Sequence, residues 1–231
     1  MLDAAAVQAI TLDLDDTLWP VWPTIHRAEA ALAQWLQGRA PGAAATLADS
    51  GQRAQLRQQV LAERPELQHD LSHQRQALIR LALQGCGEDV ALAPAAFEVF
   101  YEYRNRVDLY DDALPALQPL GARYPLVALS NGNAAPVRIG IGGFFVACVS
   151  ARDAGVAKPH RRIFDQAAQR LGLPAAAVLH VGDDGALDVL GGLAAGMQTV
   201  WVNRERQDWV HAQDPHATVD GLLALCRLLR L

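Results

Sequence analysis

Three acidic residues follow a short β-forming stretch near the N-terminus, in the segment ITLDLDDTL at residues 10–18. Residues two apart in an extended strand point to the same side, so Asp13 and Asp15 are expected on one side of the strand's carboxyl end, with Leu14 opposed. Two carboxylates about 4 Å apart repel by roughly 4 kcal/mol at an effective dielectric constant of about 20. This arrangement calls for a cation, most simply Mg²⁺, which prefers oxygen ligands.

Polar residues also follow later apolar stretches of the chain. They are Ser130 and Asn131 in SNGN, Lys158 before Pro159, and Asp183, Asp184 and Asp188 in GDDGALD. Parallel strands bring their carboxyl ends to one edge of a sheet, where ligands bind, so we expect Asp183 to converge with Asp13 and Asp15. Bound Mg²⁺ usually takes a substrate phosphate oxygen as a further ligand. The ammonium, hydroxyl and amide groups in the set then offer positive charge and hydrogen bonds to that phosphate.

Five apolar segments of near-strand length are predicted to be β-strands: residues 7–14, 124–130, 144–150, 177–183 and 198–203. Several are apolar throughout, which is typical of strands in a parallel sheet that is buried on both faces. Helical patterns at 160–172 and 186–196 separate the later strands, and this alternation indicates βαβ units. The long stretch between the first two predicted strands has helical spacing instead, as in TIHRAEAALAQWLQG.

We therefore predict an α/β fold in two parts. Residues 1–19 and 109–231 are expected to form a three-layer, Rossmann-like core around a parallel sheet. Residues 20–108 are expected to form an α-helical cap domain, inserted after the first strand of that core.

The motifs DLDDTL, SNG, Lys158-Pro159 and GDDGALD, in this order, resemble the four motifs of the haloacid dehalogenase-like hydrolases. The helical insertion between the first two motifs resembles the helical cap of that family. The resemblance implies that Asp13 is a nucleophile that forms an aspartyl-phosphate. It also implies that Asp15 is a general acid and base, which protonates the leaving oxygen and later activates water.

The same resemblance implies roles for the other motif residues. Ser130 would hold the phosphoryl group with Asn131 beside it, and Lys158 would offset the charge of phosphate and nucleophile. The Mg²⁺ ligands would be the Asp13 carboxylate, the backbone carbonyl of Asp15 and the Asp183 carboxylate. The remaining acids of the fourth motif would orient metal-bound waters and the lysine; they are Asp184 and Asp188.

The second acid of the first motif narrows the reaction class. The dehalogenase branch lacks an aspartate at the position of Asp15, because a departing halide needs no proton, so the chain is predicted to be a phosphatase or a mutase. Longer stretches, from DLDDTLWPVWPTIHRAEAAL to LHVGDDGALDVLGGLAAGM, resemble a bacterial branch that dephosphorylates flavin mononucleotide and a ribitylaminouracil phosphate. The alternatives left open are a sugar phosphomutase and a non-catalytic protein that binds a phosphorylated ligand.

Composition limits the partners. The net charge of −5 argues against a nucleic-acid binder, and no apolar run approaches the roughly 20 residues that span a bilayer. Three widely spaced cysteines fit a reducing compartment, and the N-terminus lacks a signal-peptide pattern, so a cytoplasmic protein is expected. We expect a small phosphorylated metabolite as substrate and a monomer or homodimer. The C-terminal LLALCRLLRL is predicted to be an amphipathic helix, with a dimer face as the alternative.

Several other residues have two interpretations. Trp19 and Trp22 could stack on a flat substrate ring, although packing at the cap hinge is favoured. His69 and His73 have a spacing that can bind zinc, but an exposed cap face is favoured, and His69 or Asp70 could contact substrate instead. His180 and Cys148 are each predicted to be core residues. The GIGG segment at residues 140–143 is predicted to be a loop rather than a nucleotide-binding turn.

Overall fold

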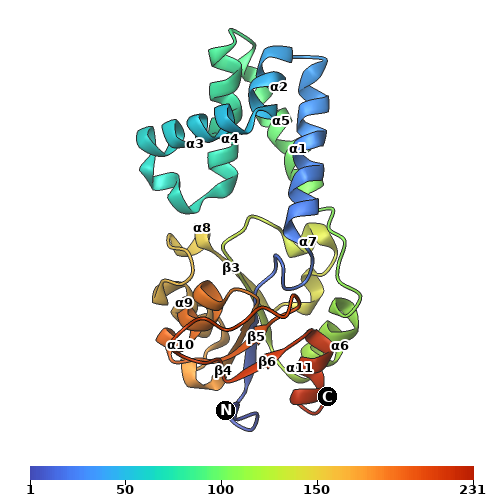
Figure 1. The fold of residues 1–231 in the computed structure, drawn as a ribbon, viewed down its shortest axis with the longest axis vertical. Coiled ribbons are helices and arrows are strands. Elements are labelled where there is room, and N and C mark those ends of the chain that lie inside the picture. The colour runs from blue at the N-terminus through green and yellow to red at the C-terminus, as the bar shows by residue number, and fades with distance from the viewer. The chain divides into compact units, whose positions relative to one another are not determined.

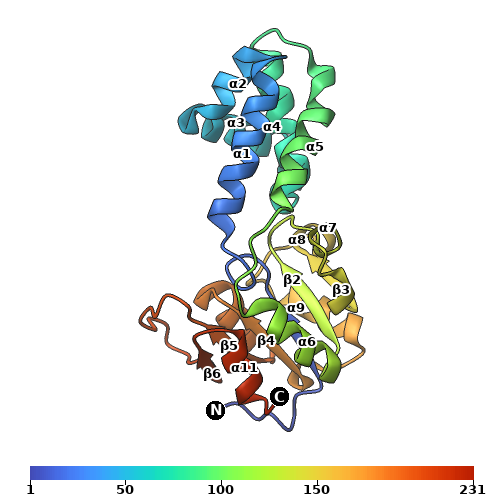
Figure 2. The ribbon, with the colours of Figure 1, turned by 90° about the vertical axis from the view of Figure 1, so that its right-hand side faces the viewer.

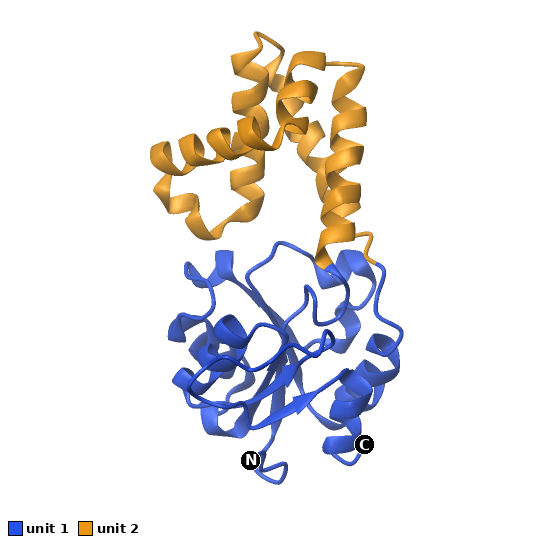
Figure 3. Ribbon diagram, in the orientation of Figure 1, with its two compact units in different colours: residues 1–20, 108–231 blue, residues 21–107 orange.

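The computed structural model describes residues 1–231, and these divide into two compact units (Figure 3). The first unit combines residues 1–20 and 108–231, and the second is the continuous segment 21–107. The first unit contains every strand of the protein, whereas the second is entirely helical.

The first unit is built around a six-stranded sheet in the order β3-β2-β1-β4-β5-β6, in which every neighbouring pair is parallel. The strands are β1 (Ala9–Leu12), β2 (Leu126–Ser130), β3 (Ala147–Ser150), β4 (Val178–Gly182), β5 (Gln198–Val202) and β6 (Ala217–Val219). All residues of β1, β2 and β4 are buried, as their continuous apolar sequences predict. The five predicted strands are confirmed, and β6 was not predicted because three residues carry too little pattern.

Helices cover both faces of this sheet, so the unit has the predicted three-layer α/β architecture (Figures 1 and 2). On one face lie α9 (Arg161–Leu171) and α10 (Gly191–Ala195), and on the other lie α6 (Ala113–Arg123) and α11 (Leu222–Leu228). The sequence pattern explains α9: Ile163, Phe164 and Ala167 form its buried stripe. It ends at Gly172, whose φ of 67° suits glycine.

The remaining secondary structure of the first unit is short. It comprises α7 (Pro136–Ile139), α8 (Ala151–Ala154), 3₁₀ turns at Gly142–Phe144 and Ala175–Ala177, and a π-helical turn at Gly185–Leu190. The GIGG segment lies in this irregular part, where Gly140 ends α7 with a φ of 92°. The segment therefore has the predicted loop character.

Strand order and register place the end of β1 at the centre of the sheet. The chain adds β2 and β3 on one side of β1 and then β4, β5 and β6 on the other. In register, Leu12 pairs with Ala128 of β2 and with Val181 of β4. The residues that follow β1 and β4 therefore emerge side by side at the point where the strand order reverses, which is where open α/β sheets bind ligands.

The second unit consists of five α-helices: α1 (Val21–Gln37), α2 (Pro41–Ala48), α3 (Ser50–Glu63), α4 (Leu71–Gly85) and α5 (Ala93–Arg104). Two 3₁₀ turns, Pro65–His69 and Val90–Leu92, join the later helices. The unit has its own apolar core, which includes Leu32, Leu36 and Phe97. Aspartates cap two of its helices, because Asp49 accepts from Gln52 N–H and Asp70 from His73 N–H.

Two further findings concern the burial of Cys148 and the apolar character of the helices. The prediction that Cys148 is a core residue is wrong: its side chain is exposed. It lies on β3, which pairs with β2 alone and forms an edge of the sheet, so the strand is not covered on all sides. None of the helices combines the length and apolar character that crossing a bilayer requires.

Candidate active site

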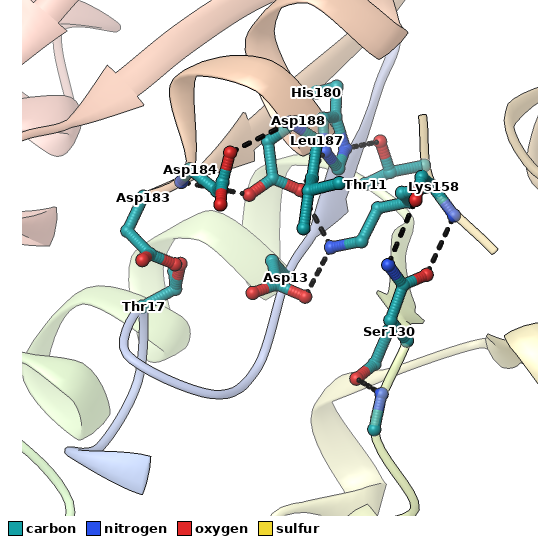
Figure 4. A network of polar contacts seen from close by, with 12 residues as sticks. Thr11, Asp13, Thr17, Ser130, Lys158, His180, Asp183, Asp184, Leu187 and Asp188 are labelled. Atoms are coloured by element: carbon teal, nitrogen blue, oxygen red, sulfur yellow. Dashed lines mark hydrogen bonds and ion pairs between the residues drawn. The ribbon is translucent and has the colours of Figure 1, made fainter. Parts of the chain in front are cut away.

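Three carboxylates from two neighbouring strand ends meet at the reversal point of the sheet (Figure 4). Asp13 directly follows β1, Asp183 directly follows β4, and Asp188 lies in the π-helical turn beyond β4. One carboxylate oxygen from each lies within 4.8 Å of those of the other two. The register of β1 and β4 brings Asp13 and Asp183 together across 170 positions of sequence, as the alignment of parallel strand ends requires.

Lys158 inserts a single positive charge into this cluster. Its Nζ lies 2.5 Å from Oδ1 of Asp13 and 2.6 Å from Oδ1 of Asp188, and all three side chains are almost completely buried. Asn131 fixes the lysine backbone from both sides: its Oδ1 accepts from Lys158 N–H at 2.7 Å, and its Nδ2 donates to the Lys158 carbonyl at 3.1 Å. The side chain of Asn131 thus positions Lys158.

The electrostatics of the cluster follow from burial and crowding. Burial raises the pKa of Asp13 well above its usual range; the charges of Asp188 and Asp183 add to this effect, whereas Lys158 opposes it. Burial and the charge of Asp188 raise the pKa of Asp183 to about 7. Burial alone would lower the pKa of Lys158, but Asp13 and Asp188 outweigh it and raise that pKa. The ammonium therefore stays charged at neutral pH.

Asp188 behaves differently from the other two acids. Burial would raise its pKa, but Lys158 and a hydrogen bond from His180 hold that pKa below the usual range. Its Oδ1 accepts hydrogen bonds from Lys158 Nζ and His180 Nε2, and its Oδ2 accepts one from Asp184 N–H at 3.1 Å. Both oxygens of Asp188 are therefore committed, and Asp13 and Asp183 are the acids with oxygens best placed to hold an ion.

The donor set fits a hard divalent cation. Three carboxyl groups face the one positive charge of Lys158, and burial together with the charge of Asp188 raises the pKa of Asp183, so a cation at this position would favour the ionised form. Oxygen donors of this kind suit Mg²⁺. A bound Mg²⁺ would restore the ionised form of Asp183 and remove the repulsion between the carboxylates.

Two residues that were not identified from the sequence hold Asp183 in place. Thr17 Oγ1 donates to Asp183 Oδ1 at 3.0 Å, and the indole N–H of Trp201 donates to the Asp183 carbonyl at 2.7 Å. Thr17 could have been found, because it follows Asp15 by two residues in the same motif. Trp201 could not, because its contact depends on the pairing of β4 with β5.

Asp15 lies in a tight loop just after Asp13. Asp16 has a φ of 59°, and its N–H donates to the Trp19 carbonyl at 2.7 Å, which closes the loop. Asp15 Oδ1 accepts from the Trp19 indole at 2.9 Å, and Trp19 is completely buried. Trp19 therefore has the packing role that was favoured over substrate stacking, while Trp22 is 66% exposed with its ring 6.2 Å from that of His26.

Two other motif residues are engaged with backbone groups. Ser130, the last residue of β2, is buried and its Oγ accepts from Gly132 N–H at 2.9 Å. Asp184 Oδ1 accepts from Ala186 and Leu187 N–H groups, each at 2.8 Å, and so caps the π-helical turn that carries Asp188. In the second unit, Asp70 Oδ2 lies 2.5 Å from His73 Nδ1.

Comparison with known proteins agrees with this geometry. A sequence profile described as haloacid dehalogenase-like hydrolase matches residues 7–196, a range that contains the whole acidic cluster and Lys158. The chain belongs to this family. Proteins similar to this chain bear the names of several different enzymes, and three of them illustrate this range.

One relative, from Escherichia coli strain K12, is named 5-amino-6-(5-phospho-D-ribitylamino)uracil phosphatase YigB and is 35% identical over 96% of each chain. A glyceraldehyde 3-phosphate phosphatase from Methanopyrus kandleri is 28% identical over 86% of this chain and 84% of its own. Among solved structures, one named 2-haloacid dehalogenase, from Pseudomonas syringae pv. Tomato DC3000, superposes with a TM-score of 0.92 at 33% identity. It covers 97% of this chain and 98% of that one.

Proposed function

We propose that this haloacid dehalogenase-like hydrolase is a Mg²⁺-dependent phosphomonoesterase that works through an aspartyl-phosphate at Asp13. The observation that carries the proposal is the ion pair between buried Asp13 and Lys158, whose atoms lie 2.5 Å apart. A second acid, Asp15, follows Asp13 by two residues. The position of Asp13 at the sheet edge where open α/β sheets bind ligands supports a nucleophilic role, and Asp15 would transfer the proton.

In the first step, a carboxylate oxygen of Asp13 attacks phosphorus and the bond from phosphorus to the leaving oxygen breaks. Asp15, protonated at this stage, gives its proton to that oxygen, and the alcohol departs. In the second step Asp15 takes a proton from water while the water oxygen attacks phosphorus, which releases inorganic phosphate and restores Asp13. Each step leaves Asp15 in the protonation state that the next one needs.

The other side chains provide electrostatic support. Lys158 would offset the negative charge that otherwise repels a phosphate dianion from Asp13, and the Ser130 hydroxyl, at the end of β2, would donate to the phosphoryl group. Asp13 and Asp183, with the backbone carbonyl of Asp15, would hold Mg²⁺. When bound, the ion supplies charge neutralisation for the phosphoryl oxygens. Asp188 and Asn131 keep Lys158 in place.

We further propose that the substrate is a ribityl phosphate attached to a flat ring system, such as the ribitylaminouracil phosphate or flavin mononucleotide. The support is the 35% identity, across 96% of both chains, to the relative named as a ribitylaminouracil phosphatase. That similarity extends through residues 21–107, the helical unit that we propose to be the cap.

A 2-haloacid dehalogenase is the second candidate, because a structural neighbour with 33% identity bears that name. Asp15 favours the phosphatase: displacement of a halide needs no proton donor, whereas a departing alkoxide does. A phosphomutase and a non-catalytic binding protein are less well supported, because nothing identifies a cap that accommodates two substrate orientations and all catalytic motif groups are present.

The proposal is tested by incubating the purified protein with the ribitylaminouracil phosphate, flavin mononucleotide and a 2-haloacid, with Mg²⁺ and with chelator. We expect inorganic phosphate from the ribityl phosphates only with Mg²⁺, and no halide. The Asp13→Asn variant is expected to bind ligand without turnover. Halide release without phosphate release would overturn the proposal, and an isomerised phosphate product would favour the mutase.

A further inference from the structure

His180 lies in the middle of β4 and is buried, as the sequence predicted, yet both of its ring nitrogens have polar partners. Nδ1 lies 2.8 Å from Oγ1 of Thr11, and Nε2 lies 3.0 Å from Oδ1 of Asp188. Thr11 and His180 face each other in the register of β1 and β4, so the sheet itself fixes their spacing. This arrangement is visible in Figure 4.

The chemistry of the partners sets the direction of these hydrogen bonds. The Asp188 carboxylate can only accept, so Nε2 of His180 must carry a proton. Burial lowers the pKa of His180, which keeps the ring neutral, and Nδ1 is then an acceptor. The Thr11 hydroxyl therefore donates to His180, and His180 donates to Asp188, in a chain that water does not reach because all three side chains are buried.

The imidazole ring is also held by packing. Phe164 stands edge-on to it, with ring centroids 5.0 Å apart. A Cβ on Gly192 would lie 3.4 Å from His180 Cβ and 2.7 Å from a methyl of Thr199, so a glycine is needed at that contact. Likewise, a Cβ on Gly182 would lie 2.3 Å from Cγ of Asp188. The backbone is therefore shaped to let His180 and Asp188 occupy these positions.

We propose that Thr11 and His180 form a positioning pair for the catalytic lysine. The pair fixes Oδ1 of Asp188, the oxygen that also holds Lys158 Nζ at 2.6 Å, and so it fixes the ammonium against Asp13. The ring nitrogens of His180 contact Thr11 and Asp188, so His180 acts on the site through Asp188. The role in turnover rests on the phosphatase function proposed above, whereas the hydrogen-bond chain does not.

The test uses two amides that reach different distances from the backbone. Glutamine places its side-chain N–H where histidine places Nε2, whereas asparagine reaches only the position of Nδ1. We expect His180→Asn and His180→Leu to lower kcat about 10- to 100-fold, the range typical when an outer residue that orients a site is lost. We expect KM to stay within about twofold and His180→Gln to recover kcat to within about fivefold of wild type.

Two measurements keep the proposal testable if the histidine variants do not fold. Thr11→Val removes the first donor while preserving shape, and we expect it to lower kcat several-fold with an unchanged KM. Imidazole ¹⁵N spectra of the wild-type protein should show His180 as the neutral tautomer protonated at Nε2, whether or not a substrate has been found. Equal losses in the asparagine and glutamine variants, full activity in Thr11→Val, or a ring protonated at Nδ1 would each overturn the proposal. Absence of phosphatase activity in the wild type, with the Nε2 tautomer present, would refute the proposed function but leave the chain of hydrogen bonds standing.

Discussion

The ammonium of Lys158 lies 2.5 Å from a carboxylate oxygen of Asp13, although 145 positions of sequence separate the two residues. Lys158 is the only lysine of the chain, and the other 19 of its 20 Lys and Arg residues are arginines. A compact ammonium fits between Asp13 and Asp188, where a planar guanidinium would need more space. We therefore expect that arginine cannot replace the single lysine at this position.

This relationship predicts that charge alone does not preserve function. Lys158→Arg keeps the positive charge but places a larger group in a buried site, so we expect a loss of kcat of about 10²- to 10³-fold, close to that of Lys158→Met. Steady-state phosphate release measures it. Arg161→Lys, at an exposed position on α9, is the matched control and should retain full activity. Wild-type turnover in Lys158→Arg would contradict the positioning argument.

Removal of the metal should give the protein a distinctive pH dependence. The pKa of Asp183 is about 7 in the folded chain and near 3.8 when unfolded, so the folded state binds the extra proton between these values. Without a divalent ion, the contribution of Asp183 to stability should therefore fall as pH rises from about 4 to about 7, whereas the lowered pKa of His180 contributes in the opposite direction. Thermal unfolding in chelator across this range measures the slope.

Mg²⁺ should reverse that effect, because it competes with the proton on Asp183. We expect its apparent affinity to rise up to about tenfold per pH unit below pH 7 and to level off above it. In Asp183→Asn, both the pH slope of the metal-free protein and the stabilisation by Mg²⁺ should be smaller. Equal Mg²⁺ stabilisation of the variant and the wild type would show that Asp183 does not hold the ion.

The indole of Trp201 is expected to strengthen Mg²⁺ binding by holding the Asp183 backbone in place. Trp201→Phe removes the 2.7 Å hydrogen bond to the Asp183 carbonyl but keeps an aromatic ring. A net loss of about 1 kcal/mol corresponds to an increase of about fivefold in the Mg²⁺ concentration needed for half-maximal activity. Trp22→Phe, at an exposed tryptophan of the helical unit, is the control. A Mg²⁺ requirement of Trp201→Phe equal to that of the wild type would show that the indole does not support the metal site through Asp183.

The acids at the strand ends were predictable because a parallel sheet aligns those ends whatever the distance in sequence. Asp13 and Asp183 illustrate this, since the apolar runs before them identify β1 and β4. The supporting contacts were not predictable. Trp201 reaches Asp183, and Thr11 reaches His180, only because of a particular strand register.

The exposure of Cys148 at the sheet edge could not be predicted from the sequence pattern either. The apolar run around Cys148 resembles a central strand, but strand order makes β3 an edge, and order is set by the whole topology. The use of Asn131 shows the same limit for a site residue. Its place in the second motif indicates proximity to phosphate, while its side-chain hydrogen bonds to the Lys158 backbone emerge only from the three-dimensional arrangement.

The central claim is that Asp13 carries the phosphoryl group during turnover, and rapid acid quenching followed by peptide mass spectrometry tests it most directly. With Mg²⁺ and a phosphorylated substrate, a phosphoryl group should appear on the peptide that contains Asp13 and should be absent from the Asp13→Asn variant, which should also release no phosphate. Phosphate release at the wild-type rate from that variant, or a phosphoryl group trapped on another residue, would contradict the claim.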